Sequence, residues 1–188
     1  MRRLARLAVL AAALACALLA AGCGNRVATR TISSTEGPYI DLDELKYQIQ
    51  ISRYLNPSDI EDRTYLLGLP SGTQQPKGDE TWFGVFLRVQ NTTDHTIPPA
   101  NQFSIVDTQG NVYHPIPQDA SVNPFAYVAN PIPSESLIPQ PDAIPSEGVI
   151  KDGALLLFKL KTESLQNRPL EFRFSHDNGT EAEIDLDV

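Results

Sequence analysis

Apolar and polar residues alternate with a period of two along much of the chain beyond residue 45. The clearest case is the C-terminal stretch, where Ala182, Ile184, Leu186 and Val188 alternate with four acidic residues. This alternation is typical of a β-strand with one buried face. Strands are predicted at residues 45–51, 81–91, 103–115 (two short strands), 153–161, 170–174 and 181–188.

The number of these strands indicates an all-β fold. About seven strands separated by turn signals are typical of an antiparallel β-sandwich, although a small barrel would show the same local patterns. The Asn178-Gly179 pair is a strong hairpin signal. Residues 81–91 are apolar on both faces, which predicts a central strand. One short helix, capped by Ser58, is the only helix expected. A chain of 188 residues has room for one domain with its own core.

The first 22 residues have the composition of a targeting segment. Arg2, Arg3 and Arg6 precede an apolar run of 15 residues at positions 7–21, as in a secretory signal peptide. A membrane-spanning helix needs roughly 20 such residues. We therefore expect residues 1–22 to be a signal peptide that is absent from the mature protein.

Cys23 follows the signal peptide and has no partner cysteine in the mature chain, because Cys16 lies within the signal peptide. A disulfide-stabilised fold is therefore not expected unless two chains pair. The sequence Ala20-Ala21-Gly22-Cys23 resembles the lipobox of bacterial lipoproteins. The resemblance implies cleavage before Cys23 and attachment of fatty acyl chains such as palmitate to this residue, and two or three such chains hold a protein firmly at a membrane. The alternative is an ordinary secretory signal that leaves a free thiol.

The charge of the mature chain argues against several partners. Three of the 15 basic residues lie in residues 1–22, so 12 basic and 23 acidic residues remain and the net charge is −11. Nucleic-acid binding requires a basic surface, and anionic lipid headgroups also attract basic segments. We therefore expect the protein to bind neither nucleic acid nor anionic lipid headgroups through its surface charge. Residues 23–38 are small and polar and are predicted to form a flexible tether, followed by one folded domain at residues 39–188.

Three segments resemble the immunoglobulin-like domains of unknown function on bacterial surface lipoproteins, which are related to the secreted immunoprotective antigen of mycobacteria. They are VFLRVQNTTDHTI at residues 85–97, FSIVDTQGNVYHP at 103–115 and IPSEGVIKDGALLLFKL at 144–160. The resemblance implies an immunoglobulin-like, extracytoplasmic β-sandwich that is usually not an enzyme, and it supplies no catalytic residues. The Cys…Trp…Cys arrangement of antibody domains is absent from this sequence.

Residue types that carry catalysis or bind cofactors form no recognisable motif. His95, His114 and His176 lie beside predicted turns without the spacing of a metal site. No serine lies in a G-x-S-x-G sequence, and there is no glycine-rich phosphate loop. We therefore expect neither enzymatic activity nor a cofactor.

Acidic residues at alternate positions of the last predicted strand form a stripe. Residues two apart on a strand share a face, so Glu183 and Asp185, with Asp177 nearby, are candidate ligands for calcium, which favours several oxygen atoms. The alternative is a solvated face that keeps an edge strand from pairing with another molecule.

The most unusual segment is residues 115–145, which contain eight of the 15 prolines. Proline lacks the amide hydrogen that a central strand needs, so we expect a long extended connection with at most a short edge strand at FAYVAN, residues 125–130. One hypothesis is that its apolar residues form a stiff surface for a protein or wall-polymer partner. The other is a crossover strap packed on the sandwich. The candidate partner-binding residues are Phe125, Tyr127, Ile132, Leu137 and Ile138.

Together these patterns predict a lipid-anchored protein of the cell envelope that faces away from the cytoplasm. Its domain is expected to act as a binding or structural module with an envelope protein or wall polymer as partner. The alternative is a solute- or metal-binding accessory lipoprotein of a transporter or envelope enzyme.

Overall fold

The computed structural model describes residues 30–144 and 153–188. The predicted signal peptide and the predicted lipidation site Cys23 lie outside the described residues. Within the described part of the chain, no helix is long and apolar enough to cross a membrane.

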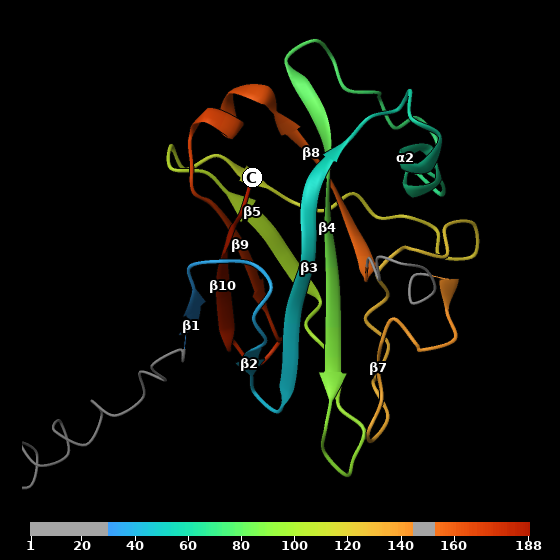
Figure 1. Cartoon of the computed structure of the whole chain (residues 1–188), viewed down its shortest axis with the longest axis vertical. Helices are drawn as coiled ribbons and strands as arrows, with labels where there is room; N and C mark the ends of the chain where they lie inside the picture. Colours follow the sequence, from blue (N-terminus) through green and yellow to red (C-terminus); the bar gives the residue numbers. More distant parts are fainter. Residues whose placement is uncertain (1–29, 145–152) are drawn as a thin grey trace, which may run out of the picture.

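Ten strands form two sheets that pack against each other as a β-sandwich (Figure 1). The first sheet has the order β1-β10-β9-β5-β6, and the second has the order β2-β3-β4-β7, with β8 also paired to β4. The predicted sandwich is therefore confirmed, and the described residues form ten strands instead of about seven, arranged as two separate sheets and not as one closed barrel. The strands are β1 (Arg30–Ser33), β2 (Ile40–Leu42), β3 (Leu45–Leu55), β4 (Glu80–Asn91), β5 (Gln102–Val106), β6 (Val112–Tyr113), β7 (Leu137–Ile138), β8 (Ala154–Lys161), β9 (Leu170–Ser175) and β10 (Glu181–Leu186).

β4 is the central strand that the sequence predicted, because it pairs with β3 on one edge and with β8 and β7 on the other. One of its faces carries Phe83, Val85, Leu87 and Val89 into the main core between the sheets. Its other face carries Trp82 and Phe86 into a second apolar cluster outside the sandwich. Both faces of β4 are therefore buried, as its two-sided apolar pattern requires.

A short helix, α2 (Ile60–Tyr65), helps to cover the outer face of β4, since Tyr65 belongs to the second cluster. The side chain of Asp59 accepts hydrogen bonds from the backbone amides of Glu61 and Asp62. Asp59 is therefore the N-cap, and the prediction of Ser58 was wrong by one residue. Both residue types can cap a helix, so the sequence alone does not choose between them.

β1 lies within the segment that was predicted to be a flexible tether. It pairs with β10 in parallel, with Arg30 opposite Glu181 and Ser33 opposite Ile184. Beyond it, the carboxylate of Glu36 accepts hydrogen bonds from the amides of Ser52 and Asp187, which links β3 to the end of β10. The folded part therefore begins by residue 30. The prediction missed β1 because this strand is held by backbone pairing and has no apolar period.

Candidate functional site

The proline-rich segment, which we call the strap and define as residues 115–144, crosses from the first sheet to the second. The amide of Ile116 donates to the carbonyl of Leu157 over 2.7 Å, and the amide of Tyr127 donates to the carbonyl of Leu155 over 2.9 Å. The strap therefore follows the free edge of β8 at two places. The predicted edge strand at residues 125–130 is reduced to one parallel bridge between Ala126 and Leu155.

Asn91, at the end of β4, anchors the far part of the strap. Its side chain is fully buried, and its amide nitrogen lies 2.9 Å from the carbonyl oxygen of Ile132 and 3.0 Å from that of Pro133. The backbone amide of Ile97 also donates a hydrogen bond to the carbonyl of Ile132, and the amide of Ile132 donates one to the carbonyl of Ile97. These contacts fix a segment whose prolines cannot form a regular ladder.

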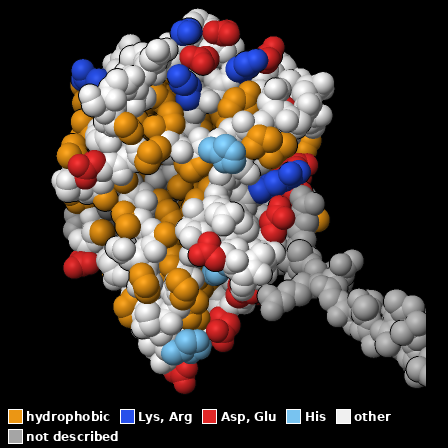
Figure 2. All heavy atoms as spheres, turned by 180° about the vertical axis from the view of Figure 1, so that it is seen from behind, with side chains coloured by type: hydrophobic (Ala, Val, Ile, Leu, Met, Phe, Trp, Pro, Cys, Tyr) orange, Lys and Arg blue, Asp and Glu red, His pale blue; other side chains and the backbone are white. Residues whose placement is uncertain are grey.

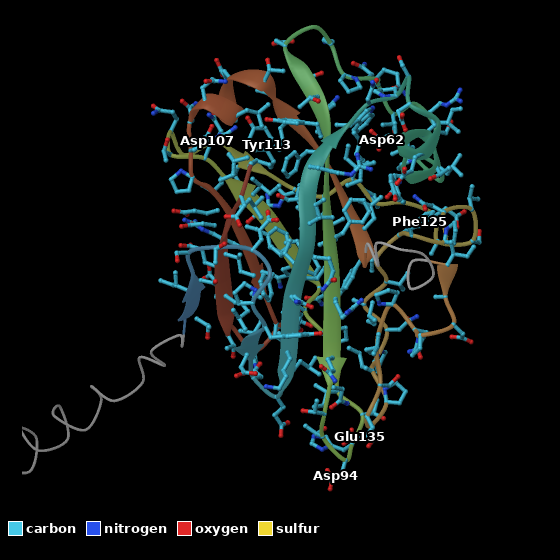
Figure 3. All side chains as sticks on the ribbon, in the orientation of Figure 1. Asp62, Asp94, Asp107, Tyr113, Phe125 and Glu135 are labelled. Carbon is cyan, nitrogen blue, oxygen red and sulfur yellow. The ribbon has the colours of Figure 1, made fainter. Side chains whose placement is uncertain are left out.

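The five candidate partner-binding residues do not gather on one exposed surface. Ile132 is only 1 % exposed, and Leu137 and Ile138 form β7, which pairs with β4. Phe125, below α2 in Figure 3, packs edge-to-face on Tyr65 at 4.8 Å. Tyr127 packs on the main core. This placement is that of the packed crossover, the second of the two hypotheses, while partner binding by these residues stays a prediction.

The first sheet is incomplete beside the strap. β9 pairs with all of β5, from Gln102 to Val106, whereas β6 pairs only with Ile105 and Val106. β6 stops because Pro115 and Pro117 follow closely and have no amide hydrogen to extend the ladder. The chain then runs to the edge of β8, so no strand among the described residues covers one edge of β5 at residues 102–104.

A groove lies along this uncovered edge, between β5 and β8, and we call it the β5–β8 groove. Its outer compartment of about 550 Å³ runs over the outer face of the first sheet and is lined by Asn101, Gln102, Phe103, Ser104, His114, Pro115, Arg173, Phe174, Ser175 and Glu181. Its inner compartment of about 220 Å³ lies under the strap and is lined by Asn101, Phe103, Pro115, Ile116, Pro117, Gln118, Ala126, Tyr127, Ala129, Leu155, Leu156 and Leu157. The compartments share Asn101, Phe103 and Pro115 and therefore adjoin each other.

The two compartments differ in polarity. Amide, hydroxyl and charged side chains dominate the outer one, whereas aliphatic and aromatic side chains dominate the inner one. Figure 2 shows the molecule from behind, where hydrophobic side chains lie close to a histidine and a basic side chain. Such a mixture of an apolar surface with a few polar groups is common in binding sites.

Two tyrosines fix the loop that leads into β5. The amide of Ala100 donates to the hydroxyl of Tyr47 over 2.8 Å, and the hydroxyl of Tyr127 donates to the carbonyl of Ala100 over the same distance. The ring of Tyr127 also packs edge-to-face on Phe103 at 5.1 Å. The start of β5 and one wall of the inner compartment are therefore held in place before any ligand binds.

Tyr47 continues this network to a partly buried histidine, His176. Its hydroxyl lies 2.8 Å from Nε2 of His176, whose Nδ1 lies 3.6 Å from a carboxylate oxygen of Asp43. Burial lowers the pKa of His176, although the charges of Asp43 and Asp177 oppose this effect. Burial also raises the pKa of Tyr47. Nε2 of the neutral histidine can accept a hydrogen bond from the tyrosine hydroxyl, while the oxygen of that hydroxyl accepts a hydrogen bond from the amide of Ala100.

At the other end of β5, Asp107 closes the turn to β6, and both Asp107 and Tyr113 are labelled in Figure 3. The carboxylate of Asp107 accepts hydrogen bonds from the backbone amides of Gln109 and Asn111 and from the side chain of Asn111. Burial alone would raise the pKa of Asp107, but these hydrogen bonds, with one from Ser164, lower it to about 2. The turn is therefore rigid, and it is the proline side of β6 that leaves β5 open.

The candidate calcium ligands are divided between two places. Glu183 and Asp185 lie close to Glu171, with ligand atoms within 4.8 Å of one another. Asp177 lies apart from this group, and its carboxylate accepts hydrogen bonds from the side chains of Asn101 and Gln102 beside the outer compartment.

Arg173 supplies positive charge to the acidic group, since it pairs with Glu171 and, over 3.0 Å, with Glu183. Burial, with the charges of Glu171 and Asp187, raises the pKa of Asp185. β10 is also not an edge strand, because it pairs with β9 and β1. Pairing with β1 therefore protects it, in place of the predicted solvated edge, and calcium binding stays a prediction.

The chain resembles solved structures in fold, whereas no protein-family model and no curated protein matches it. The yjhA protein of Bacillus subtilis is 9% identical with a TM-score of 0.50, and the match covers 82% of this chain and 99% of that protein. An uncharacterized β-sandwich protein of Clostridium difficile is 10% identical with a TM-score of 0.44, covering 86% and 97%. A proposed lipoprotein of Bacillus subtilis, ycdA, is 12% identical with a TM-score of 0.44, covering 79% and 38%. At these identities the likeness concerns the fold alone.

His176 makes the stability of the fold depend on pH. Its pKa is lower in the folded than in the unfolded chain, so the unfolded chain binds more protons just below pH 6.5, and the free energy of unfolding falls as the pH is lowered. Each unit of difference between the two pKa values is worth about 1.4 kcal/mol.

Urea unfolding at pH 7.5 and pH 5.0 measures this effect. The loss of stability at pH 5.0 should be smaller in His176→Gln than in the wild type, and His95→Gln is the control. His95 is exposed, and Asp94 raises its pKa, so its removal should not reduce the loss. An equal loss in wild type and His176→Gln would contradict the role of His176.

Proposed function

We propose that this protein is a lipid-anchored module of the cell envelope that binds a partner outside the cytoplasm in the β5–β8 groove. The observation that carries the proposal is the uncovered edge of β5 beside a groove with adjoining polar and apolar compartments. The lipobox-like sequence before Cys23 supports the anchor. Kinship with the mycobacterial antigen family rests on the three resembling segments and belongs to the proposal.

The anchor would hold the domain close to the membrane. β1 begins at Arg30, so only residues 24–29 separate it from Cys23. The seven residue steps from Cys23 to Arg30 span at most about 25 Å. This maximum length is half of the length that a tether reaching to residue 38 would span. The domain would therefore meet partners at the membrane surface or in the adjacent wall.

The groove supports binding in preference to catalysis. His114 is the only histidine among the described residues that line it, and Nδ1 of His114 lies 3.2 Å from the carbonyl oxygen of Phe103. Among the described residues, no hydrogen bond links His114 to a serine or a carboxylate. Arg173 is engaged by two glutamates. A nucleophile with an adjacent base is the arrangement that covalent catalysis needs, and the described residues of the groove offer none.

A solute-binding accessory lipoprotein is the second candidate function. The volume of the outer compartment, about 550 Å³, supports it, since small-molecule sites commonly have 300–1,000 Å³. The two candidates differ in what occupies the groove. A compact solute would fill the outer compartment alone, whereas a polymer would extend into the inner one.

The anchor is tested by metabolic labelling with a fatty acid analogue in a bacterial host that expresses the full chain. We expect the wild type to be labelled and to sediment with membranes, because Cys23 carries the acyl chains. Cys23→Ala should lose the label and leave the membrane fraction. Equal labelling of the two proteins would contradict lipidation at Cys23.

The groove is tested by thermal unfolding of the mature protein with cell-wall fragments, sugars, peptides and metal ions. A ligand at 100 times its Kd adds about 2.7 kcal/mol to the free energy of unfolding, which raises Tm by several degrees. Ala129→Trp should abolish the shift, because Ala129 is exposed and lines the inner compartment. Ala120→Trp, exposed in the same strap but outside both compartments, is the matched control. A shift that Ala129→Trp leaves intact would contradict binding of a partner in the inner compartment and would favour a compact solute in the outer one.

A further inference from the structure

We infer that the β5–β8 groove takes an extended peptide, which adds to the first sheet as a strand beside β5. This inference rests on the proposed binding function and names the class of partner. Addition of a strand to an open sheet edge is a recurring mode of peptide recognition, in which the backbone gives affinity and pockets for alternate side chains give specificity.

The backbone of β5 is oriented for such an addition. In an antiparallel sheet, successive residues direct their amide and carbonyl groups to opposite edges. The carbonyl of Phe103 lies 3.2 Å from Nδ1 of His114, on the groove side, and not in the ladder with β9. The backbone amide and carbonyl groups of Phe103 therefore point to the same edge of β5 as those of Ile105, which pairs with Tyr113 of β6. An incoming strand would continue the line of β6 past the point where Pro115 interrupts it.

The two compartments match the two faces of the added strand. Phe103 belongs to the core and lines both compartments, whereas Gln102 and Ser104 line the outer compartment alone. Cross-strand neighbours lie on the same face of a sheet. A residue placed opposite Phe103 would therefore enter the apolar inner compartment, and its two neighbours in the peptide would lie in the polar outer compartment. The expected ligand alternates between apolar and polar residues.

His114 occupies part of the position that the peptide would take. Its side chain is exposed and contacts the backbone of β5 in place of a strand. An imidazole on an exposed side chain can swing away, so an incoming amide can replace it at the carbonyl of Phe103. Removal of this side chain should therefore leave peptide affinity unchanged or raise it, which distinguishes His114 from a residue that binds the ligand.

The probe is a phage-displayed library of random 12-residue peptides, selected on the mature protein in detergent micelles. We expect enriched peptides in which apolar and polar residues alternate, and synthetic copies should bind with a stoichiometry of one in calorimetry. Ala129→Trp should weaken binding about tenfold or more, because it fills the inner compartment, while Ala120→Trp and His114→Ala should not weaken it. Methylation of alternate backbone nitrogens of the peptide should abolish binding.

Three results would overturn the inference. One is the absence of any enriched peptide, and another is binding that Ala129→Trp does not change. The third is binding that survives backbone methylation at every position. If peptides fail while a cell-wall fragment gives a thermal shift that Ala129→Trp removes, the groove remains a binding site and only the peptide is wrong. If peptides bind outside the groove and no fragment depends on Ala129, the proposed function falls as well.

Discussion

β4 has two apolar faces and two paired edges, and the rest of the fold follows from the need to cover all four. The first sheet buries one face, and α2 with the strap buries the other, where Tyr65 and Phe125 meet Trp82 and Phe86. Large buried aromatic side chains contribute much of the stability of a small domain. The strap is therefore a structural cover for the second sheet, which explains why Phe125 packs inward although this part of the strap has no regular secondary structure.

The same requirement creates the opening on the first sheet. The chain after β6 would have to pair with β5 and cover the edge of β8, and one segment cannot do both. Pro115 and Pro117 end the pairing with β5, and Ile116 between them pairs with Leu157 of β8. Uncovered strand edges are usually protected because they invite pairing with other chains. In this fold the edge is flanked by a groove and a single histidine, which is why we interpret it as a site and not as an unprotected edge.

The sequence predicted the parts of the fold that depend on side-chain burial. Strands β3, β4, β8, β9 and β10 all have a clear period of two or two apolar faces, and each was found within a few residues of its expected bounds. The hairpin at Asn178-Gly179 was also correct, and Gly179 has the positive φ of 87° that the turn requires. β1 was missed because backbone pairing with β10, and not burial, holds it.

The candidate site was hidden from the sequence for a different reason. Phe103, His114 and Tyr127 come from three segments, and only the crossing of the strap between the sheets brings them together. One local signal was available, since a proline directly after a short strand indicates that pairing ends there. The acidic stripe shows the opposite failure: the period was right, but the sequence does not reveal that Arg173 and β1 lie against it.

Residue-resolved amide hydrogen exchange of the free protein tests the open edge of β5 most directly. Amides in a paired ladder exchange only when the sheet opens, whereas an amide directed at a groove exchanges without such an opening. The amide of Phe103 should therefore exchange much faster than that of Ile105, although both residues are buried in the same strand. Equal protection of the two amides would show that the edge of β5 is already closed, and it would contradict the β5–β8 groove as a site for an added strand.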